Sequence, residues 1–263
     1  MLSLGLHLGV GSPRVRSGFA LTDISGLQAW YKFNTLHTLD GGALASWGDS
    51  SGNGHTLTNT GATNKRPSVE NNGRVDWGDV PSSFMDIQNG SVPNSRPYTV
   101  IVVVEHEVVL LTKISRYLNG SSSSSSVDTI SWGTLGSTTN QLWQSLLAGF
   151  SDSTSRISTS QPSGKLVNNT KTISIFRYGG GSTDGDTSFT IETVADGGSL
   201  TQVHNTTAAN SNDEVLNCTA VGLNSTNQYI QGYMDEMCIW NRRITGNELT
   251  EVIADLKARH NMT

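Results

Sequence analysis

The chain has 263 residues, only 15% of them charged, and a formal net charge of −5. This mildly acidic balance excludes the basic footprint of a nucleic-acid-binding protein and offers no attraction to an anionic membrane. Its 28 glycines, few prolines and many Ser, Thr and Asn residues favour short strands joined by turns over a helical bundle. A single all-β sandwich accommodates this length.

Residues 1–22 form a glycine-rich leader without an acidic side chain. The leader lacks the basic start and the small-residue cleavage site of a signal peptide, and no apolar run in the chain reaches the ~18 residues of a membrane span. We therefore expect residues 1–22 to be an extended docking arm that contacts partner proteins, and residues 23–263 to form the domain. Neither a membrane nor a nucleic acid is expected as a partner.

Alternating and β-branched segments mark the expected strands. Leu27–Phe33 alternates along its length, which predicts a half-buried strand, and the turn residues of Trp47–His55 follow it. Tyr98–Leu111 has an unbroken β-branched centre, which predicts a central strand buried on both faces. Shorter strands are expected at Thr129–Trp132, Gln141–Leu147, Thr172–Tyr178, Ser188–Val194, Val215–Val221 and Tyr229–Trp240.

The end of the chain predicts one helix. Thr245 and Glu248 fit a capping box, in which the two side chains satisfy backbone amides at the helix start. Apolar side chains then recur at helical spacing and form one stripe, made of Leu249, Val252, Ile253 and Leu256. This stripe should pack on the sandwich.

Two segments carry a family resemblance. LQAWYKFN…LASWGDSSGNGH near the start and QGYMDEMCIWNRRITGNELTEVI near the end resemble the concanavalin A-like, laminin G-like jelly-roll domains. In that family, an apolar-Trp-Tyr-x-Phe strand leads to a Trp-x-Asp-Ser-Ser-Gly-Asn-Gly turn, and a closing Asp-Glu strand precedes a short helix. Cys238 and Arg243 depart from the family pattern, where Arg and Ala are common. The resemblance implies an all-β fold, an antiparallel jelly-roll sandwich (concanavalin A-like) with one C-terminal α-helix.

Members of this family include lectins, adhesion modules, glucanases and structural proteins of tailed phages, so the fold alone does not choose a function. The resemblance, together with one domain and a glycine-rich arm, favours a non-enzymatic structural protein on the surface of a tailed-phage virion. Such a protein would decorate the head or tail, bind other virion proteins through residues 1–22, form homo-oligomers such as trimers, and adhere weakly to glycans. Two alternatives stay open, a carbohydrate-binding lectin module and a glycoside hydrolase.

Glu105 and Glu107 are the candidate catalytic residues of the hydrolase alternative. They alternate onto one face of a strand, with Cα atoms about 7 Å apart at ~3.3 Å per residue. Glucanases of this fold pair carboxylates on one strand, one as nucleophile and one as acid/base. The third carboxylate of that motif is missing here, which favours a strand that runs out into solvent. For the lectin alternative, Trp132 and Trp143 are candidates for stacking on sugar rings.

No metal or other cofactor is expected, although calcium stays open. Asp184 and Asp186 have the spacing of part of a calcium loop, but the remaining oxygen ligands are missing from the sequence and a plain turn is favoured. Cys218 and Cys238 lie in expected strands, where a disulfide or two buried thiols would fit. Buried thiols are favoured because Cys packs well as a small apolar residue.

The closing segment MDEMCIWNRRITGNEL contains two adjacent acids, Asp235 and Glu236. Regular alternation places Met234 on the face of Glu236 and opposite Asp235, so the two acids should point apart and form no carboxylate pair. We expect one of them to be a buried acceptor for Arg242 or for loop amides. Asp49, Asp235, Glu236 and Arg242 are therefore predicted to form a structural clasp.

Overall fold

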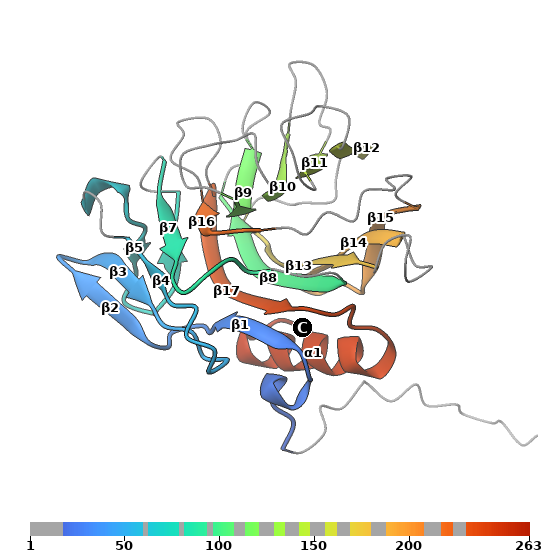
Figure 1. The fold of residues 1–263 in the computed structure, drawn as a ribbon, viewed down its shortest axis with the longest axis horizontal. Coiled ribbons are helices and arrows are strands. Elements are labelled where there is room, and N and C mark those ends of the chain that lie inside the picture. Colours follow the sequence, from blue (N-terminus) through green and yellow to red (C-terminus); the bar gives the residue numbers. More distant parts are fainter. Residues whose placement is uncertain are drawn as a thin grey trace, which may run out of the picture.

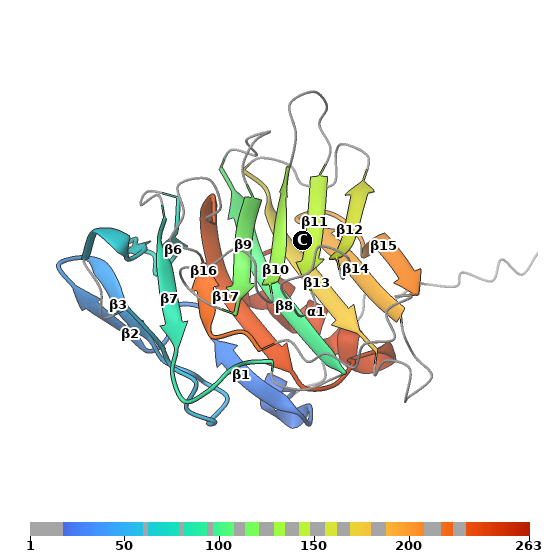
Figure 2. The same ribbon diagram turned by 45° about the horizontal axis from the view of Figure 1, so that its top comes forward.

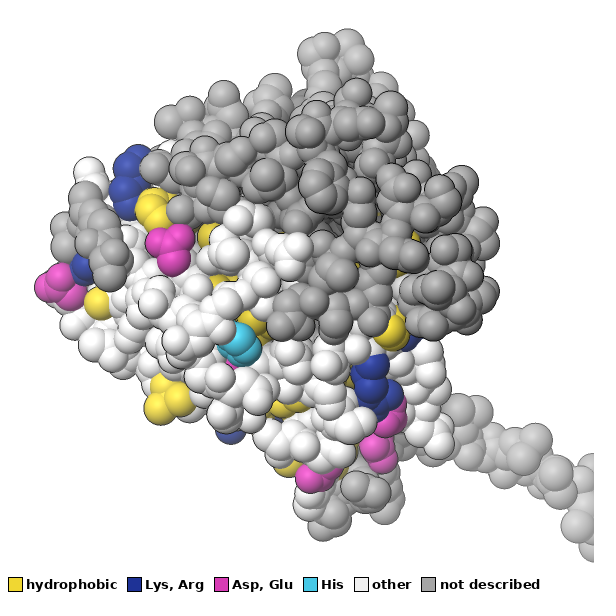
Figure 3. Space-filling view, viewed as in Figure 1, with side chains coloured by type: hydrophobic (Ala, Val, Ile, Leu, Met, Phe, Trp, Pro, Cys, Tyr) yellow, Lys and Arg dark blue, Asp and Glu magenta, His cyan; other side chains and the backbone are white. Residues whose placement is uncertain are grey.

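The computed structural model describes most of the chain. Described are residues 18–59, 63–78, 82–93, 97–107, 114–120, 129–134, 142–147, 156–161, 169–179, 188–207, 217–222 and 230–263. For 114–116, 129–134, 142–147, 156–161, 188–189 and 203–207 only the backbone is described. On the side seen in Figure 3, the described surface is mostly uncharged, with acidic and basic side chains in small separate spots.

One antiparallel sheet forms the centre of the molecule. Its strands are, in order across the sheet, β1 (Leu27–Tyr31), β17 (Gly232–Trp240), β8 (Tyr98–His106), β13 (Lys171–Tyr178), β14 (Ser188–Ala195) and β15 (Thr201–Thr207). Figure 2 shows β17, β8, β13 and β14 side by side. Because β1 pairs with β17, the two segments that carry the family resemblance are neighbours in space.

A second antiparallel sheet faces the first. Its strands are, in order, β4 (Leu57–Thr58), β7 (Phe84–Ile87), β16 (Ala220–Gly222), β9 (Ile114–Asn119), β10 (Thr129–Thr134), β11 (Leu142–Leu147) and β12 (Arg156–Gln161). The short strands β2 (His37–Asp40), β3 (Ala43–Trp47), β5 (Ser68–Val69) and β6 (Val75–Asp76) connect β4 to β17 along one side. The structure confirms the predicted antiparallel β-sandwich (Figure 1).

Two apolar clusters hold the layers together. The between-sheets cluster fills the sandwich interior and includes Trp47, Trp77 and Val102. The helix-side cluster lies between the first sheet and α1 (Gly246–Arg259) and includes Val103 and Trp240. Neighbouring residues of β8 thus enter different clusters, which confirms that this central strand is buried on both faces. The strand ends at His106, earlier than predicted, where the chain bends at Glu107; residues 108–113 lie outside the described residues.

The predicted C-terminal helix is present as α1. Figure 1 shows it against β1 and β17, on the side away from the second sheet, with Leu249, Val252 and Leu256 buried. The capping-box prediction is wrong, because Thr245 makes no side-chain cap hydrogen bond and the Glu248 carboxylate accepts a hydrogen bond from Arg242. Within the described part of the chain, no helix has the length and apolar character needed to cross a membrane.

The domain begins before residue 23. Leu21, in the short helix η1 (Leu21–Asp23), is fully buried in the helix-side cluster, and Phe19 packs against the same cluster. Residues 18–22 of the predicted arm are therefore part of the domain. The remainder of that arm, residues 1–17, lies outside the described residues.

Asp49 holds the turn after β3 against β1. Its carboxylate accepts hydrogen bonds from the backbone N–H groups of Trp30, Ser51 and His55 at 2.9, 2.8 and 3.0 Å. Asn53, in the same turn, donates to two carbonyl groups at the start of the domain's first strand. The turn residues recognised in the sequence thus act by bonding to β1 rather than only to one another.

The closing strand β17 is irregular at its two acids. Its register against β8 shifts between Met234 and Glu236, which marks a β-bulge at Asp235. Met234 lies in the between-sheets cluster with Met237, not on the face of Glu236. The predicted alternation is wrong here, because the bulge inserts one extra residue into the strand. Met234 and Glu236, two positions apart, therefore face opposite sides of the sheet. Asp235 and Glu236 consequently share a network of partners near the end of α1.

The two cysteines are buried thiols and do not form a disulfide, as favoured from the sequence. Cys218 lies in the between-sheets cluster and Cys238 in the helix-side cluster. The first sheet therefore separates the two side chains, and its thickness excludes a bond between them.

His106, at the end of β8, is a buried neutral imidazole. Its Nδ1 lies 3.0 Å from the backbone oxygen of Gln231, which can only accept, so Nδ1 carries the proton. Its Nε2 accepts from the hydroxyl of Tyr117, 2.9 Å away. Burial lowers the pKa of His106 from its ordinary 6.5 to about 4, although the Gln231 hydrogen bond opposes the shift.

His106 should make stability depend on pH. Between pH 6.5 and about 4 the unfolded chain binds a proton here that the folded protein does not, so the free energy of unfolding falls as pH is lowered. The pKa difference corresponds to about 3.5 kcal/mol at about 1.4 kcal/mol per unit. Urea unfolding at about pH 7 and about pH 4.5 should show a smaller loss for His106→Asn than for the wild type. An equal loss in both proteins would contradict this prediction.

Candidate functional site

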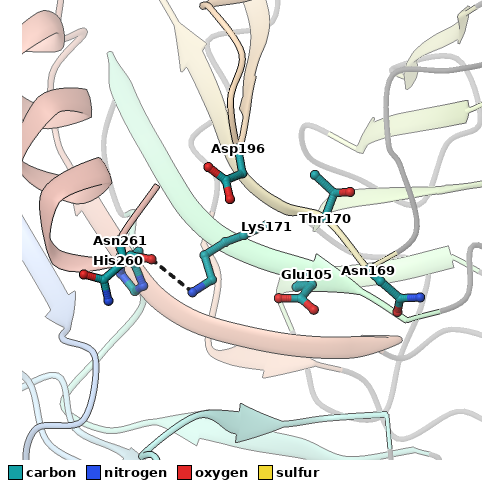
Figure 4. A pocket seen from close by; sticks show the side chains of 7 residues that line it. All are labelled: Glu105, Asn169, Thr170, Lys171, Asp196, His260 and Asn261. Atoms are coloured by element: carbon teal, nitrogen blue, oxygen red, sulfur yellow. Dashed lines mark hydrogen bonds between the residues drawn. The ribbon is translucent and has the colours of Figure 1, made fainter. Parts of the chain in front are cut away.

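A polar pocket opens at one end of the first sheet, beside the end of α1 (Figure 4). Its volume is about 570 Å³. Every residue that lines it has a hydrogen-bonding side chain, namely Glu105, Asn169, Thr170, Lys171, Asp196, His260 and Asn261.

Antiparallel pairing gathers these residues from distant parts of the chain. Glu105, near the end of β8, pairs with Lys171 at the start of β13. The end of β14 pairs with the same part of β13, and the backbone N–H of Asp196 donates to the carbonyl of Lys171 at 2.9 Å. His260 and Asn261 follow α1 directly. The pocket therefore lies where three strand ends and one helix end meet.

Hydrogen bonds hold the end of the chain at the pocket wall. The Nζ of Lys171 donates to the carbonyl oxygen of His260 at 3.3 Å, as Figure 4 shows. The Asp196 carboxylate accepts from the backbone N–H of Thr263 at 2.8 Å and from its hydroxyl at 3.3 Å. The backbone hydrogen bond from Thr263 lowers the pKa of Asp196, so this carboxylate is ionised at neutral pH.

One arginine bridges two carboxylates beside the pocket. The Nη2 of Arg74 lies 3.0 Å from Glu105, and its Nε donates to Asp235 at 3.1 Å. The guanidinium also lies 3.8 Å from the centre of the Tyr233 ring, a cation–π contact. The Nζ of Lys171 is 3.9 Å from the fully buried Asp235. Two cations thus compensate the buried carboxylate.

Glu236 is also fully buried and joins three elements. Its Oε1 accepts from the indole N–H of Trp30 at 2.6 Å and from Arg259 at 2.8 Å. Its Oε2 accepts from Nε2 of His260 at 2.8 Å and from the backbone N–H of Phe33 at 3.5 Å. A carboxylate with polar partners on both oxygens can stay charged in the interior.

The two adjacent acids have opposite pKa shifts. Burial raises the pKa of Asp235, and the charge of Arg74 opposes this shift. Burial acts in the same direction on Glu236, but the hydrogen bond from His260 and the charge of Arg259 outweigh it, so the pKa of Glu236 lies below its ordinary value. Opposite shifts in neighbouring carboxyl groups occur at functional sites and in structural ion-pair networks.

The two predicted catalytic residues have different surroundings. Glu105 lines the pocket and pairs with Arg74, whereas Glu107 follows the end of β8 and is not among the residues that line the pocket. Through Arg74, the structure brings Glu105 together with Asp235.

The other sequence candidates fall outside this site. Trp132 lies in β10 and Trp143 in the adjacent β11 of the second sheet, and their side chains lie outside the described residues. Asp184 and Asp186 lie outside the described residues altogether. Among the residues that are described, no group of three or more His, Cys, Asp or Glu could hold a metal ion.

Arg242 is not the partner of the closing acids that the sequence predicted. It pairs with Glu248 and donates to the carbonyl of Ser25 at 2.7 Å. The physical reason is the direction of α1, which runs back along β17: Arg242 lies at the helix start, whereas Glu236 lies beside the helix end. Arg259, not Arg242, therefore binds Glu236.

Sequence reasoning missed most residues of the pocket and its cluster, including Arg74, Lys171 and Asp196. Asn169 and Asn261 were not predicted as site residues either; both adopt left-handed backbone conformations, with φ of 54° and 53°. Each of these residues carries only a local turn or strand-end signal. What makes them a site is the pairing order of β8, β13 and β14, which the sequence does not display.

The fold is similar to those of carbohydrate-active proteins. Domain 4 of AbnA, a GH43 extracellular arabinanase from Geobacillus stearothermophilus solved in complex with arabinotriose, is 18% identical over 86% of this chain and 97% of that chain, with a TM-score of 0.53. The Trypanosoma rangeli sialidase in complex with sialic acid is 12% identical over 93% of this chain and 35% of that chain, with a TM-score of 0.54. A GH54 α-L-arabinofuranosidase is 12% identical over 87% of this chain and 59% of that chain, with a TM-score of 0.54. No family model and no curated protein sequence matches.

At these identities the similarity shows the β-sandwich fold, and the chain spans only 35% of the length of the sialidase. The prediction of a non-enzymatic structural protein of a phage virion is nevertheless corrected. The similar structures come from an arabinanase, a sialidase and an arabinofuranosidase. They support neither a phage role nor the expectation that the protein is not an enzyme.

Replacement of Asp235 by alanine should destabilise the fold, because the variant leaves Arg74 without one of its two carboxylate partners in a poorly solvated position. We expect a cost on the order of 2–4 kcal/mol, as for an orphaned buried partner. Glu248→Ala is the matched control, because its pair with Arg242 has side chains 42% and 29% exposed and should contribute under about 1 kcal/mol. Urea unfolding of both variants measures the difference. A melting temperature of Asp235→Ala equal to that of the wild type would rule out this role.

Proposed function

We propose that this chain binds neutral oligosaccharides in the polar pocket, as the β-sandwich domain of a carbohydrate-active protein. The observation that carries the proposal is the pocket itself, about 570 Å³ in volume and lined entirely by residues with hydrogen-bonding side chains. This volume lies within the range of small-molecule sites.

The lining matches the chemistry of sugar hydroxyl groups, which both donate and accept hydrogen bonds. The carboxylates of Glu105 and Asp196 accept, the ammonium group of Lys171 donates, and the amides of Asn169 and Asn261 do both. A site built from such groups discriminates strongly against ligands that leave them unpaired.

The charges around the pocket favour an uncharged ligand, because they are already compensated. Glu105 pairs with Arg74, Lys171 lies near Asp235, and Asp196 accepts hydrogen bonds from the end of the chain. An ionised ligand would have to compete with one of these contacts. A neutral oligosaccharide can add hydrogen bonds without breaking an ion pair.

The fold also supports this proposal. Domain 4 of the arabinanase, 97% of which is covered by the match, was solved in complex with arabinotriose. Arabinotriose is therefore the first ligand to test, followed by a panel of other neutral oligosaccharides.

Calorimetric titration of arabinotriose and the panel tests the function and the pocket separately. Asn169→Gly and Asn261→Gly remove an amide while keeping a residue that tolerates positive φ, and each should weaken binding about tenfold. Asn89→Gly is the matched control, because this asparagine has a φ of 59° and does not line the pocket. Binding that all three variants retain equally would place the site elsewhere. Failure of every oligosaccharide to bind would reject the function.

Glycoside hydrolysis is a second candidate, favoured by two carboxyl groups bound to Arg74. Glu105 lines the pocket, whereas Asp235 is fully buried behind it and shares Arg74 with Glu105. Glycosidases use carboxyl groups as general acid, general base or nucleophile, and of these two only Glu105 can contact a ligand in the pocket.

Release of reducing sugar from arabino-oligosaccharides tests the hydrolysis. Glu105→Gln should lower the rate at least about 100-fold, the range for loss of a general acid or base, while oligosaccharide binding persists. Glu107→Gln, one strand period away and outside the pocket lining, should keep its rate. No release by the wild type would remove this candidate and leave the binding function intact.

A further inference from the structure

A row of four side chains crosses the first sheet where α1 ends. Tyr233 on β17 pairs with Glu105 on β8, and Glu105 pairs with Lys171 on β13. Asp196, the residue after β14, lies opposite Lys171 and donates its backbone N–H to the Lys171 carbonyl oxygen. Side chains of directly paired residues point to the same face of a sheet, so these four residues form one row, the strand-end row. Figure 4 shows three of its members, Glu105, Lys171 and Asp196, around the pocket.

The helix leaves this row uncovered. Two residues further along the same strands, Val103, Ile173 and Val194 are buried in the helix-side cluster, together with side chains of α1. In the strand-end row, by contrast, Asp196 is exposed and the other three members are half-buried. The pocket is therefore one part of a strip of accessible sheet surface. Tyr233 continues this strip beyond the residues that line the pocket.

Tyr233 is held in place at both its ring and its hydroxyl group. The Arg74 guanidinium lies 3.8 Å from the ring centre, and the hydroxyl donates to the Glu70 carboxylate at 2.8 Å. The same guanidinium lies 3.0 Å from Glu105, which fixes the ring relative to the pocket. A side chain that is already ordered loses little conformational freedom when a ligand contacts it.

Tyr233 adds a kind of contact that the polar pocket does not offer. Among the described residues that line the pocket there is no Phe, Tyr or Trp. A sugar ring carries hydroxyl groups, which the pocket can bind, but it also has an apolar face of C–H groups. An aromatic ring can pack on such a face, and a tyrosine can do so while its hydroxyl stays at the wet surface.

The length of the row indicates what kind of ligand could use all of it. From Tyr233 to Asp196 the row crosses three strand spacings, or about 14 Å at ~4.8 Å each. A single sugar ring cannot contact both ends of such a row at once, whereas a chain of linked sugars can.

We infer that the pocket takes an oligosaccharide that lies across the strands, with one sugar unit in the pocket and a further unit packed on Tyr233. This inference rests on the proposed function. It adds a specificity-determining residue to the site and a preference for linked sugars over single ones.

Calorimetric titration with arabinotriose and with arabinose tests the inference. The wild type should bind arabinotriose at least about tenfold more tightly than arabinose. Tyr233→Leu removes the ring but keeps an apolar side chain, so it should weaken arabinotriose binding about tenfold and leave arabinose binding within about twofold. Tyr233→Phe is the matched control, because it keeps the ring beside Arg74 and should retain the preference for arabinotriose. If another oligosaccharide of the panel binds in place of arabinotriose, that sugar and its monosaccharide are the probe pair.

The outcomes separate the inference from the function on which it rests. Unchanged arabinotriose binding in Tyr233→Leu, or an equal loss for both sugars, would overturn the inference and leave the proposed function standing. Failure of every oligosaccharide to bind the wild type would reject the function and the inference with it.

Hydroxyl-radical footprinting of the wild-type protein gives a second readout, which does not depend on how Tyr233→Leu affects Arg74. Saturating arabinotriose should reduce the oxidation of Tyr233 several-fold, and saturating arabinose should not. Leu39 is the reference, because it is 50% exposed and lies in β2, outside the strand-end row, so its oxidation should stay the same with either sugar. Equal oxidation of Tyr233 with and without bound arabinotriose would contradict the inference.

Discussion

A buried carboxylate holds the two ends of this domain together. Glu236, in the closing strand, accepts hydrogen bonds from Trp30 in the opening strand and from Arg259 and His260 at the end of the helix. A carboxylate removed from water is tolerated only when both oxygens are paired. The relative positions of β1, β17 and α1 are therefore tied to one side chain, and a shift of β1 or of α1 would remove part of the hydrogen bonds that compensate the buried charge.

This constraint places the end of the chain and thereby shapes the polar pocket and the surface next to it. His260 and Asn261 line the polar pocket, whereas Met262 and Thr263 line an apolar groove between α1 and the turn that joins β14 to β15. Four consecutive residues thus serve two different environments. The pocket is polar because strand ends meet there and present turn residues and charged side chains. The groove is apolar because the flank of an amphipathic helix meets a hairpin that does not fully cover it.

Local sequence patterns predicted the strands and the helix well, because the formation of a strand or a helix depends mainly on residues that are close in the sequence. The β-branched centre of β8 predicted burial on both faces, and the apolar stripe of α1 predicted which face meets the sheet. The errors came where a distant partner decided the outcome. Glu248 was expected to cap its own helix but binds Arg242, and the bulge at Asp235 reverses the expected face of Met234. A bulge depends on pairing with β8, which periodicity within one strand cannot reveal.

By itself, the sequence determined the fold class, the C-terminal helix and the burial of one of the two adjacent acids, because strand alternation, helical spacing and turn residues are local properties of the chain. It also singled out Glu105 as a candidate, together with Glu107, because alternation places both on one face of a strand. Only the tertiary structure decided that Arg74 joins Glu105 to Asp235, and that Lys171, Asp196 and the end of α1 form one pocket. The physical reason is that these contacts join residues far apart in the chain, and the pairing of β8, β13, β14 and β17 brings them together.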